Sequence, residues 1–380
     1  MVRGSLARNL TTTISVIIPT CNRQKLFPRI HRLWKDAGVS IVIVDGSISP
    51  SRYFDELDLG TYQYLHLPFT GPFERIFTGL LFASTQYSVI CGDDEYILSS
   101  TLMEAAQRLN NSSSIRFIQA RFIGFEWKNQ CGLRYRKIYT EQVSEWEEPE
   151  DINMRIASNA LRMSPTHIYA LTHRKIHLEM FRAASNVGNI PIRGLQETIS
   201  EIVGSHYGQY MVTRNYGYLR SFEDSSIHAL GGAVKGPINL THADNSGTNY
   251  LPINTKYLRS LAKSIALMEG KSVREVTKTR QSLEKSLLVG FTAMAYGWKL
   301  FNTYASDSDL KRRIVEFSRE PFAVKLRVDT QSLYNWYKSR EEALDAGSFN
   351  INPQVELNIE EFCGFESCIS DYYLNTYRGI

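Results

Sequence analysis

The stretch YSVICGDDEY, residues 87–96, decides the fold: a short apolar run ends in a glycine and three consecutive acids. Such a run, bounded by a turn residue, is typical of a buried strand. In open α/β sheets, ligands bind beyond the carboxyl ends of the strands, where loops converge. Three adjacent carboxylates there repel one another unless a cation joins them, so they indicate either a Mg²⁺ or Mn²⁺ site or a solvated helix cap.

Outward from this stretch, short apolar runs alternate with helical patterns through the first 125 residues, which predicts an α/β sheet of mostly parallel strands. The predicted strands are 14–18, 41–44, 62–67, 87–91 and 115–122. The predicted helices between them are 25–38, 72–84 and 101–110. The last helix begins with the capping-box pattern of Thr101 and Glu104.

The second half has a weaker pattern. Strand-like runs occur at 133–139 and 166–172, and helical patterns at 152–163, 175–184 and 195–206. A loop rich in Gly and Asn, 231–249, marks a boundary or a flap. Several helices are predicted over 250–346, and the tail 349–380 has no assignment. The predicted organisation is a domain 1–230 with halves 12–125 and 126–230, the loop 231–249, and a mainly helical region 250–380.

Composition narrows the functional classes. The 43 basic and 39 acidic residues are interspersed and leave a net charge of +4, which argues against a dedicated nucleic-acid binder. The five cysteines form no CxxC pair, so reduced thiols in a cytoplasmic protein are expected. Neither a signal peptide nor a span of about 20 apolar residues is present, so we expect any contact with the inner membrane face to be peripheral.

Two more polar loops follow predicted strands. Pro19-Thr20-Cys21-Asn22-Arg23 follows the first strand, and Asp45-Gly46-Ser47 follows the second. Each is ordinary turn chemistry when taken alone. Three such loops on one edge of one sheet describe a cleft.

SVIIPTCNR, IVIVDGS and YSVICGDDEY, in this order, resemble the opening of the family-2 GT-A glycosyltransferases, in which IPTYNR, DDGS and a DxD-type motif recur. The GDDEY form is similar to a bacterial subgroup, and the resemblance covers about the first 110 residues. It implies a GT-A fold and an inverting, metal-dependent transfer of a sugar from a nucleotide-diphosphate sugar. The acceptor would be a hydroxyl of a glycan or lipid-linked glycan, in cell-surface polysaccharide synthesis.

The resemblance also assigns residues. Those that it places at the nucleotide-sugar are Pro19, Thr20, Asn22, Arg23, Asp45, Gly46, Ser47, Arg75 and Asp93. It places Asp94 and Glu95 nearest the metal and diphosphate. This chain has one Asp before Gly46 and a Glu at the end of the triplet, so which two carboxylates bind metal is open.

Fewer sequence features identify the residues on the acceptor side of the predicted site. Members of this family often carry the catalytic base near a helix start about 100 residues after the metal motif, and Glu197 is the best match, with Glu201 one turn later. The alternative is an ordinary surface glutamate. Arg220 and His228 follow in YGYLRSFEDSSIHAL and are expected at the diphosphate and metal, or else are solvated.

Other functions are compatible with the sequence. A nucleotidyltransferase would need a glycine-rich loop after the first strand, and PTCNRQK has no glycine. A non-catalytic nucleotide-sugar-binding or scaffold module would keep the fold without the chemistry. The apolar segment 285–304 is either a core helix or a helix lying on a membrane surface. The sugar, the base, the acceptor and the oligomeric state are not indicated.

Overall fold

The computed structural model describes residues 13–54, 62–128, 132–137, 146–162, 167–185, 195–222, 314–316, 319, 331 and 358–378. The predicted loop 231–249 and the apolar segment 285–304 lie outside the described residues, as does nearly all of the predicted helical region 250–346. Those assignments therefore stay predictions.

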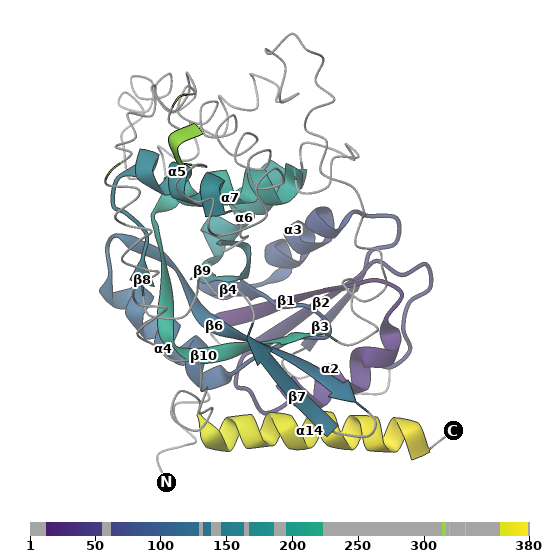
Figure 1. The fold of residues 1–380 in the computed structure, drawn as a ribbon. Helices are drawn as coiled ribbons and strands as arrows, with labels where there is room; N and C mark the ends of the chain where they lie inside the picture. Colours follow the sequence, from purple (N-terminus) through teal and green to yellow (C-terminus); the bar gives the residue numbers. More distant parts are fainter. Residues whose placement is uncertain are drawn as a thin grey trace.

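The described residues form one mixed sheet flanked by helices, which confirms the predicted α/β class (Figure 1). One half is parallel, in the order β3 (Tyr62–His66), β2 (Ser40–Asp45), β1 (Ile14–Thr20) and β4 (Tyr87–Ile90). These are the first four predicted strands.

The other half of the sheet is mixed. The antiparallel strand β9 (Leu171–His173) joins β4 to β6 (Ile115–Lys128), which is the fifth predicted strand. Strand β10 (Gln209–Ser221) runs parallel to β6, and β5 (Tyr96–Ile97) pairs with it in the antiparallel direction. Strands β7 (Gly132–Lys137) and β8 (Trp146–Glu147) pair with β6 and β10.

Helices cover both faces (Figure 1). The helix α2 (Phe27–Trp34), which follows a 3₁₀ turn η1 (Gln24–Leu26), lies on the same side as α4 (Ser99–Asn111) and the C-terminal helix α14 (Ile359–Arg378). On the opposite side lie α3 (Pro72–Phe82), α5 (Ile152–Arg162), α6 (Arg174–Ser185) and α7 (Leu195–Tyr207). Each helix predicted within the described residues is present, and α14 gives the unassigned tail a helix.

Two local predictions were wrong. The helix α4 begins at Ser99, two residues before the predicted capping box, and the residue before it, Leu98, makes no side-chain cap. The strand-like run 166–172 is a 3₁₀ turn η3 (His167–Tyr169) followed by the short β9.

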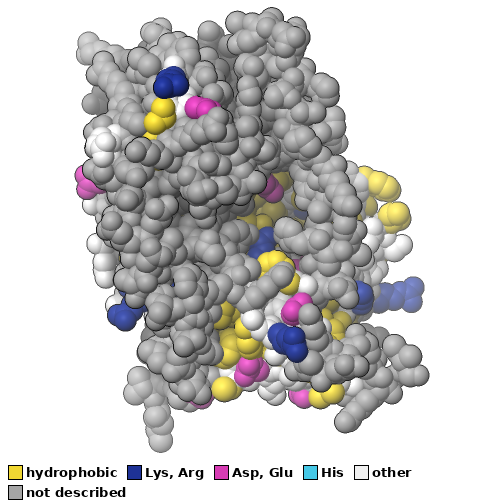
Figure 2. All heavy atoms as spheres, viewed as in Figure 1, with side chains coloured by type: hydrophobic (Ala, Val, Ile, Leu, Met, Phe, Trp, Pro, Cys, Tyr) yellow, Lys and Arg dark blue, Asp and Glu magenta, His cyan; other side chains and the backbone are white. Residues whose placement is uncertain are grey.

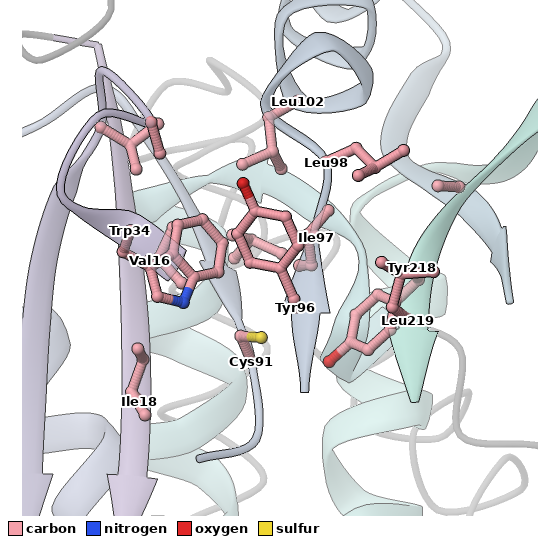
Figure 3. Close-up of a cluster of buried hydrophobic side chains, with 14 of the residues drawn as sticks. Val16, Ile18, Trp34, Cys91, Tyr96, Ile97, Leu98, Leu102, Tyr218 and Leu219 are labelled. Carbon is pink, nitrogen blue, oxygen red and sulfur yellow. The ribbon is translucent and has the colours of Figure 1, made fainter. Parts of the chain in front are cut away.

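The core beside the acidic stretch combines aliphatic side chains with the aromatic rings of Trp34, Tyr96 and Tyr218 (Figure 3). Trp34 of α2 and Tyr96 of β5 meet edge to face with ring centroids 4.6 Å apart, an arrangement that aromatic pairs prefer. Cys91 and Tyr218 are buried against this cluster. The loop between β4 and β5 is therefore held at both ends by packed side chains.

No helix among the described residues is long and apolar enough to span a bilayer. On the face drawn in Figure 2, the described acidic and basic side chains are scattered rather than gathered by sign. That distribution agrees with the mixed charge pattern of the sequence.

Candidate functional site

The strand register brings the three predicted loops together. Thr20 at the end of β1 pairs with Asp45 at the end of β2. The register between β1 and β4 ends with Ile17 beside Ile90, so the next residues of β1 lie level with the acidic loop. The parallel strands thus deliver all three loops to one edge of the sheet, as the sequence predicted.

Asp93 and Asp94 point toward the loop after β1. Asp93 accepts hydrogen bonds from Thr20 Oγ1 and Arg23 Nη1, both at 2.6 Å. The second nitrogen of the same guanidinium, Nη2, lies 2.6 Å from Asp94 Oδ2. One arginine fork therefore joins two neighbouring carboxylates, an arrangement that the planar guanidinium suits and a lysine does not.

Glu95 points the other way, toward β10. Its Oε1 lies 3.1 Å from Arg220 Nε, and its Oε2 accepts hydrogen bonds from Tyr218 OH at 2.8 Å and Gly92 N at 3.1 Å. The guanidinium of Arg220 also lies over the ring of Tyr169, with its carbon 5.3 Å from the centroid. The three consecutive acids thus face two different partners rather than one common point.

Burial and charge raise the proton affinity of this loop. Burial, together with the charge of Asp94, raises the pKa of Asp93, although Arg23 acts in the opposite direction. Burial also raises the pKa of Glu95 against the opposing charge of Arg220. For Arg23, burial alone would lower the pKa, but the two aspartates outweigh it and raise the pKa. Carboxyl groups held this way are candidates for a functional site.

Asp45 organises the loop after β2. Its carboxylate is fully buried and accepts hydrogen bonds from Ser47 N, Ser47 Oγ, Gln24 Nε2 and Tyr64 OH at 2.5–3.1 Å. Ser47 Oγ in turn accepts a bond from Asn22 N at 2.7 Å, and Gly46 N donates to Thr20 O. The loops after β1 and β2 are thereby bonded into one unit. That Asp45 meets a nucleotide base stays a prediction.

Arg75 lies beside this unit and carries a buried positive charge. Its Nη1 donates to Thr70 O at 2.7 Å, while its buried Nε has no hydrogen-bond partner in the described ranges. A Cβ built on Gly46 would lie 1.9 Å from Arg75 Nη1, so the guanidinium rests against the Gly46 backbone. Among the described residues, no carboxylate pairs with Arg75. A buried unpaired charge is costly, so this position favours an anion.

The residues predicted on the acceptor side have different surroundings. Glu197 lies half-buried in the first turn of α7, and its role as a base stays a prediction. Glu201 is buried and bonded to His167 Nδ1 at 2.7 Å and to the backbone N–H groups of His167 and Ile168. It therefore holds η3 rather than facing an acceptor. His228 lies outside the described residues.

Several residues that hold the site had not been predicted. They are Gln24, Arg29, Tyr64, Tyr218 and Glu361. The alternation of Tyr216, Tyr218 and Arg220 was a usable sign that this segment is a strand ending near Glu95. The other residues give no local sign.

No family model matches the sequence, and no curated protein matches it. Among solved structures, S. aureus TarS 1–349 in complex with UDP-GlcNAc has a TM-score of 0.45 and 14% identity, covering 96% of this chain and 92% of that one. The same protein without that ligand gives 0.41 and 13%, covering 77% and 92%. At this identity and TM-score, neither ligand nor activity transfers to this chain.

Proposed function

We propose that the chain is a glycosyltransferase that takes a nucleotide-diphosphate sugar and transfers the sugar to a hydroxyl acceptor. One observation carries the proposal. At a single edge of the sheet, the buried Arg75 guanidinium lies beside the Asp45–Ser47 turn, and the Asp93–Asp94 pair lies across the loop after β1. An anion site next to carboxylates suits a ligand that joins a diphosphate to polyhydroxylated sugars.

A divalent cation, Mg²⁺ or Mn²⁺, belongs to the proposal. The described residues hold no group of three or more metal-ligating side chains. Asp94 nevertheless fits a cation held by one carboxylate and substrate phosphates, because no described residue donates to its Oδ1. Glu95 as a second ligand stays a prediction, since both of its oxygens bond to protein groups here. The bound ion would supply charge neutralisation for the leaving diphosphate.

The chain's own residues divide the remaining work. Arg75 is proposed to bind the diphosphate, and Arg23 to hold Asp93 and Asp94 in place near the donor. In an inverting transfer, the acceptor oxygen forms a bond to the anomeric carbon while the bond from that carbon to the diphosphate breaks. Glu197 is the proposed base that takes the proton of the acceptor hydroxyl.

A glycan or lipid-linked glycan of the cell surface is proposed as acceptor, with the protein in the cytoplasm and in peripheral contact with the inner membrane face. The donor base remains to be measured. TarS has been crystallised in complex with UDP-GlcNAc and with UDP, and these two compounds are convenient first probes.

The test is binding of UDP, GDP and CMP, with and without Mn²⁺, by calorimetry. We expect one diphosphate to bind, more tightly with Mn²⁺, and Asp94→Asn to remove the metal effect. Asp371→Asn on helix α14 is the matched control, because this carboxylate is 44% exposed and, within the described part of the chain, pairs only with Arg32 at 2.6 Å. If none of the three nucleotides binds, the donor site is refuted and the hypothesis of a non-catalytic scaffold module is favoured. Stronger binding of UTP than of UDP would favour a nucleotidyltransferase.

Transfer itself is a separate measurement. We expect wild type to release nucleoside diphosphate from the donor that binds, and Glu197→Gln to bind that donor normally while losing most of the release. Normal release by Glu197→Gln would remove this residue from the mechanism and leave the donor site standing.

A further inference from the structure

The helix α14 supplies the cap that α4 lacks. The carboxylate of Glu361 accepts hydrogen bonds from Ser99 N, from Ser100 N at 3.1 Å and from Ser100 Oγ at 2.7 Å. The first backbone N–H groups of a helix have no partner within the helix, and a carboxylate there also meets the positive end of the helix dipole. These bonds join residues about 260 positions apart.

The same carboxylate reaches the residue that follows the acidic triplet. Tyr96 OH donates to Glu361 Oε1 at 3.4 Å, and the Tyr96 ring stacks on Phe365 with centroids 5.9 Å apart. Tyr96 follows Glu95 directly, and Ser99 begins α4 three residues later. One side chain of α14 therefore fixes the segment on the carboxyl side of the acids.

A second link runs to the middle of the triplet. The guanidinium of Arg29, which is buried, donates to the backbone oxygen of Asp94 at 2.7 Å. Its other nitrogen lies 3.5 Å from Tyr373 OH, and its carbon lies 5.9 Å from the centre of the Tyr372 ring. Asp94 is thus tied through Arg29 to the C-terminal half of α14, which runs along this side of the sheet in Figure 1.

We propose that Glu361 is a positioning residue for the acidic loop, so that α14 sets where Asp93, Asp94 and Glu95 lie. The loop carries three adjacent carboxyl groups that repel one another, so it needs fixed anchors on both sides. On the amino-terminal side of the loop the anchor is β4, which is held in the sheet by its pairing with β1. On the other side the anchor is the segment from β5 to the start of α4, where the Ser99 and Ser100 amides and the Tyr96 hydroxyl bond to Glu361.

The structural half of the proposal is tested without any ligand. Glu361→Gln keeps the size and one acceptor oxygen but removes the charge and the second acceptor. We expect amide hydrogen exchange over residues 92–101 to become about tenfold faster, as loss of a charged hydrogen bond implies. Asp371→Asn is the control, because it breaks the exposed Arg32–Asp371 pair between α14 and α2 without touching the loop.

Two exchange results would overturn the proposal. Unchanged exchange in Glu361→Gln would remove the positioning role, and equal acceleration in both variants would show that α14 merely docks on α2. If Glu361→Gln does not fold, Ser100→Ala removes one of the bonds and allows the same comparison.

The functional half rests on the proposed donor site. We expect the Kd for the bound nucleotide to rise about three- to tenfold in Glu361→Gln, because small misplacements of binding groups weaken binding, and to stay unchanged in Asp371→Asn. Faster exchange with no nucleotide binding by wild type would refute the proposed function and leave the positioning role intact. Faster exchange with unaltered nucleotide affinity would overturn the claim that α14 sets the carboxylates for the donor.

Discussion

Replacing Gly46 with alanine displaces Arg75 without changing a charge. The added Cβ would lie 1.9 Å from Arg75 Nη1 and 2.5 Å from its Cζ. Because Cβ contacts below 3.0 Å essentially never occur, the nearest nitrogen must move by at least about 1.1 Å, the difference between 3.0 and 1.9. Gly46 is not among the glycines with positive φ, so its backbone can accept alanine.

The expected effects on folding and binding differ in size. The displaced group is the end of a flexible side chain, and alanine gains about 0.4–1 kcal/mol by restricting the unfolded chain, so the free energy of unfolding should change little. A charge-assisted hydrogen bond from Arg75 to a diphosphate would be lost after such a shift. At about 1.5–3 kcal/mol for that bond, the Kd for the nucleotide should rise about 10- to 150-fold.

The assay is calorimetric titration of the nucleotide that wild type binds, with urea unfolding as the measure of stability. A double-mutant cycle adds Arg75→Ala alone and Arg75→Ala with Gly46→Ala. If alanine acts through Arg75, the double variant should bind as Arg75→Ala does, within about 0.5 kcal/mol. Wild-type affinity in Gly46→Ala, or an equal further loss in the Arg75→Ala background, would refute the reasoning.

Two predictions concern stability alone. In Gly79→Ala, a Cβ would lie 2.8 Å from Val44 Cγ1, so urea unfolding should show a loss of about 1–3 kcal/mol; Gly364→Ala, with no atom within 4 Å, should show none. Burial alone would lower the pKa of His167, but Glu148 and Glu201 outweigh it and raise the pKa to about 9 from 6.5. Because the folded pKa is the higher one, this stabilisation is complete below pH 6.5 and is lost as pH rises through about 9, a change of about 3 kcal/mol in unfolding free energy. Glu201→Gln should flatten that slope, and parallel curves for the two proteins would contradict the assignment.

The parallel half of the sheet was predictable because each of its strands can be recognised from its own short stretch of sequence. The runs at β1, β2 and β4 are mostly apolar and almost entirely buried, as expected for strands covered on both faces. The strand β10 was missed because Arg214 and Asn215, which are exposed, interrupt its apolar pattern; its register with β6 shifts at the same place, between Val212 and Tyr216. The strand β5 has two residues, too few for any periodicity.

The helix α4 shows why a local rule can fail. Thr101 and Glu104 have the spacing of a capping box, yet the amides at the helix start bond to Glu361. Several side chains can accept hydrogen bonds from the few free N–H groups at a helix start. Here the acceptor is the carboxylate of Glu361, which tertiary packing brings to that position. Nothing near Thr101 in the sequence could have indicated a partner in α14.

The sequence predicted which loops form the site, but it did not predict which side chains pair with one another there. The loops after β1, β2 and β4 meet as expected because parallel strands end at one edge. Adjacency of Asp94 and Glu95 suggested one shared cation, whereas the turn at Asp93–Asp94, closed by the bond from Glu95 N to Gly92 O, directs Asp94 to Arg23 and Glu95 to Arg220. The sequence does not show in which direction each side chain of such a turn points.

The acidic loop is therefore part of the fold as well as of the proposed donor site. Its three carboxyl groups bond to Arg23 and Arg220, and its backbone bonds to Arg29 of α2. Removing one partner of a buried ion pair leaves the other charge uncompensated, at a typical cost of about 3–5 kcal/mol. A charge-removing substitution here would lower stability and binding together, so lost activity alone could not assign a role. Substitutions that conserve charge, such as Gly46→Ala, separate the two effects because they move a guanidinium while leaving every ion pair of the loop in place.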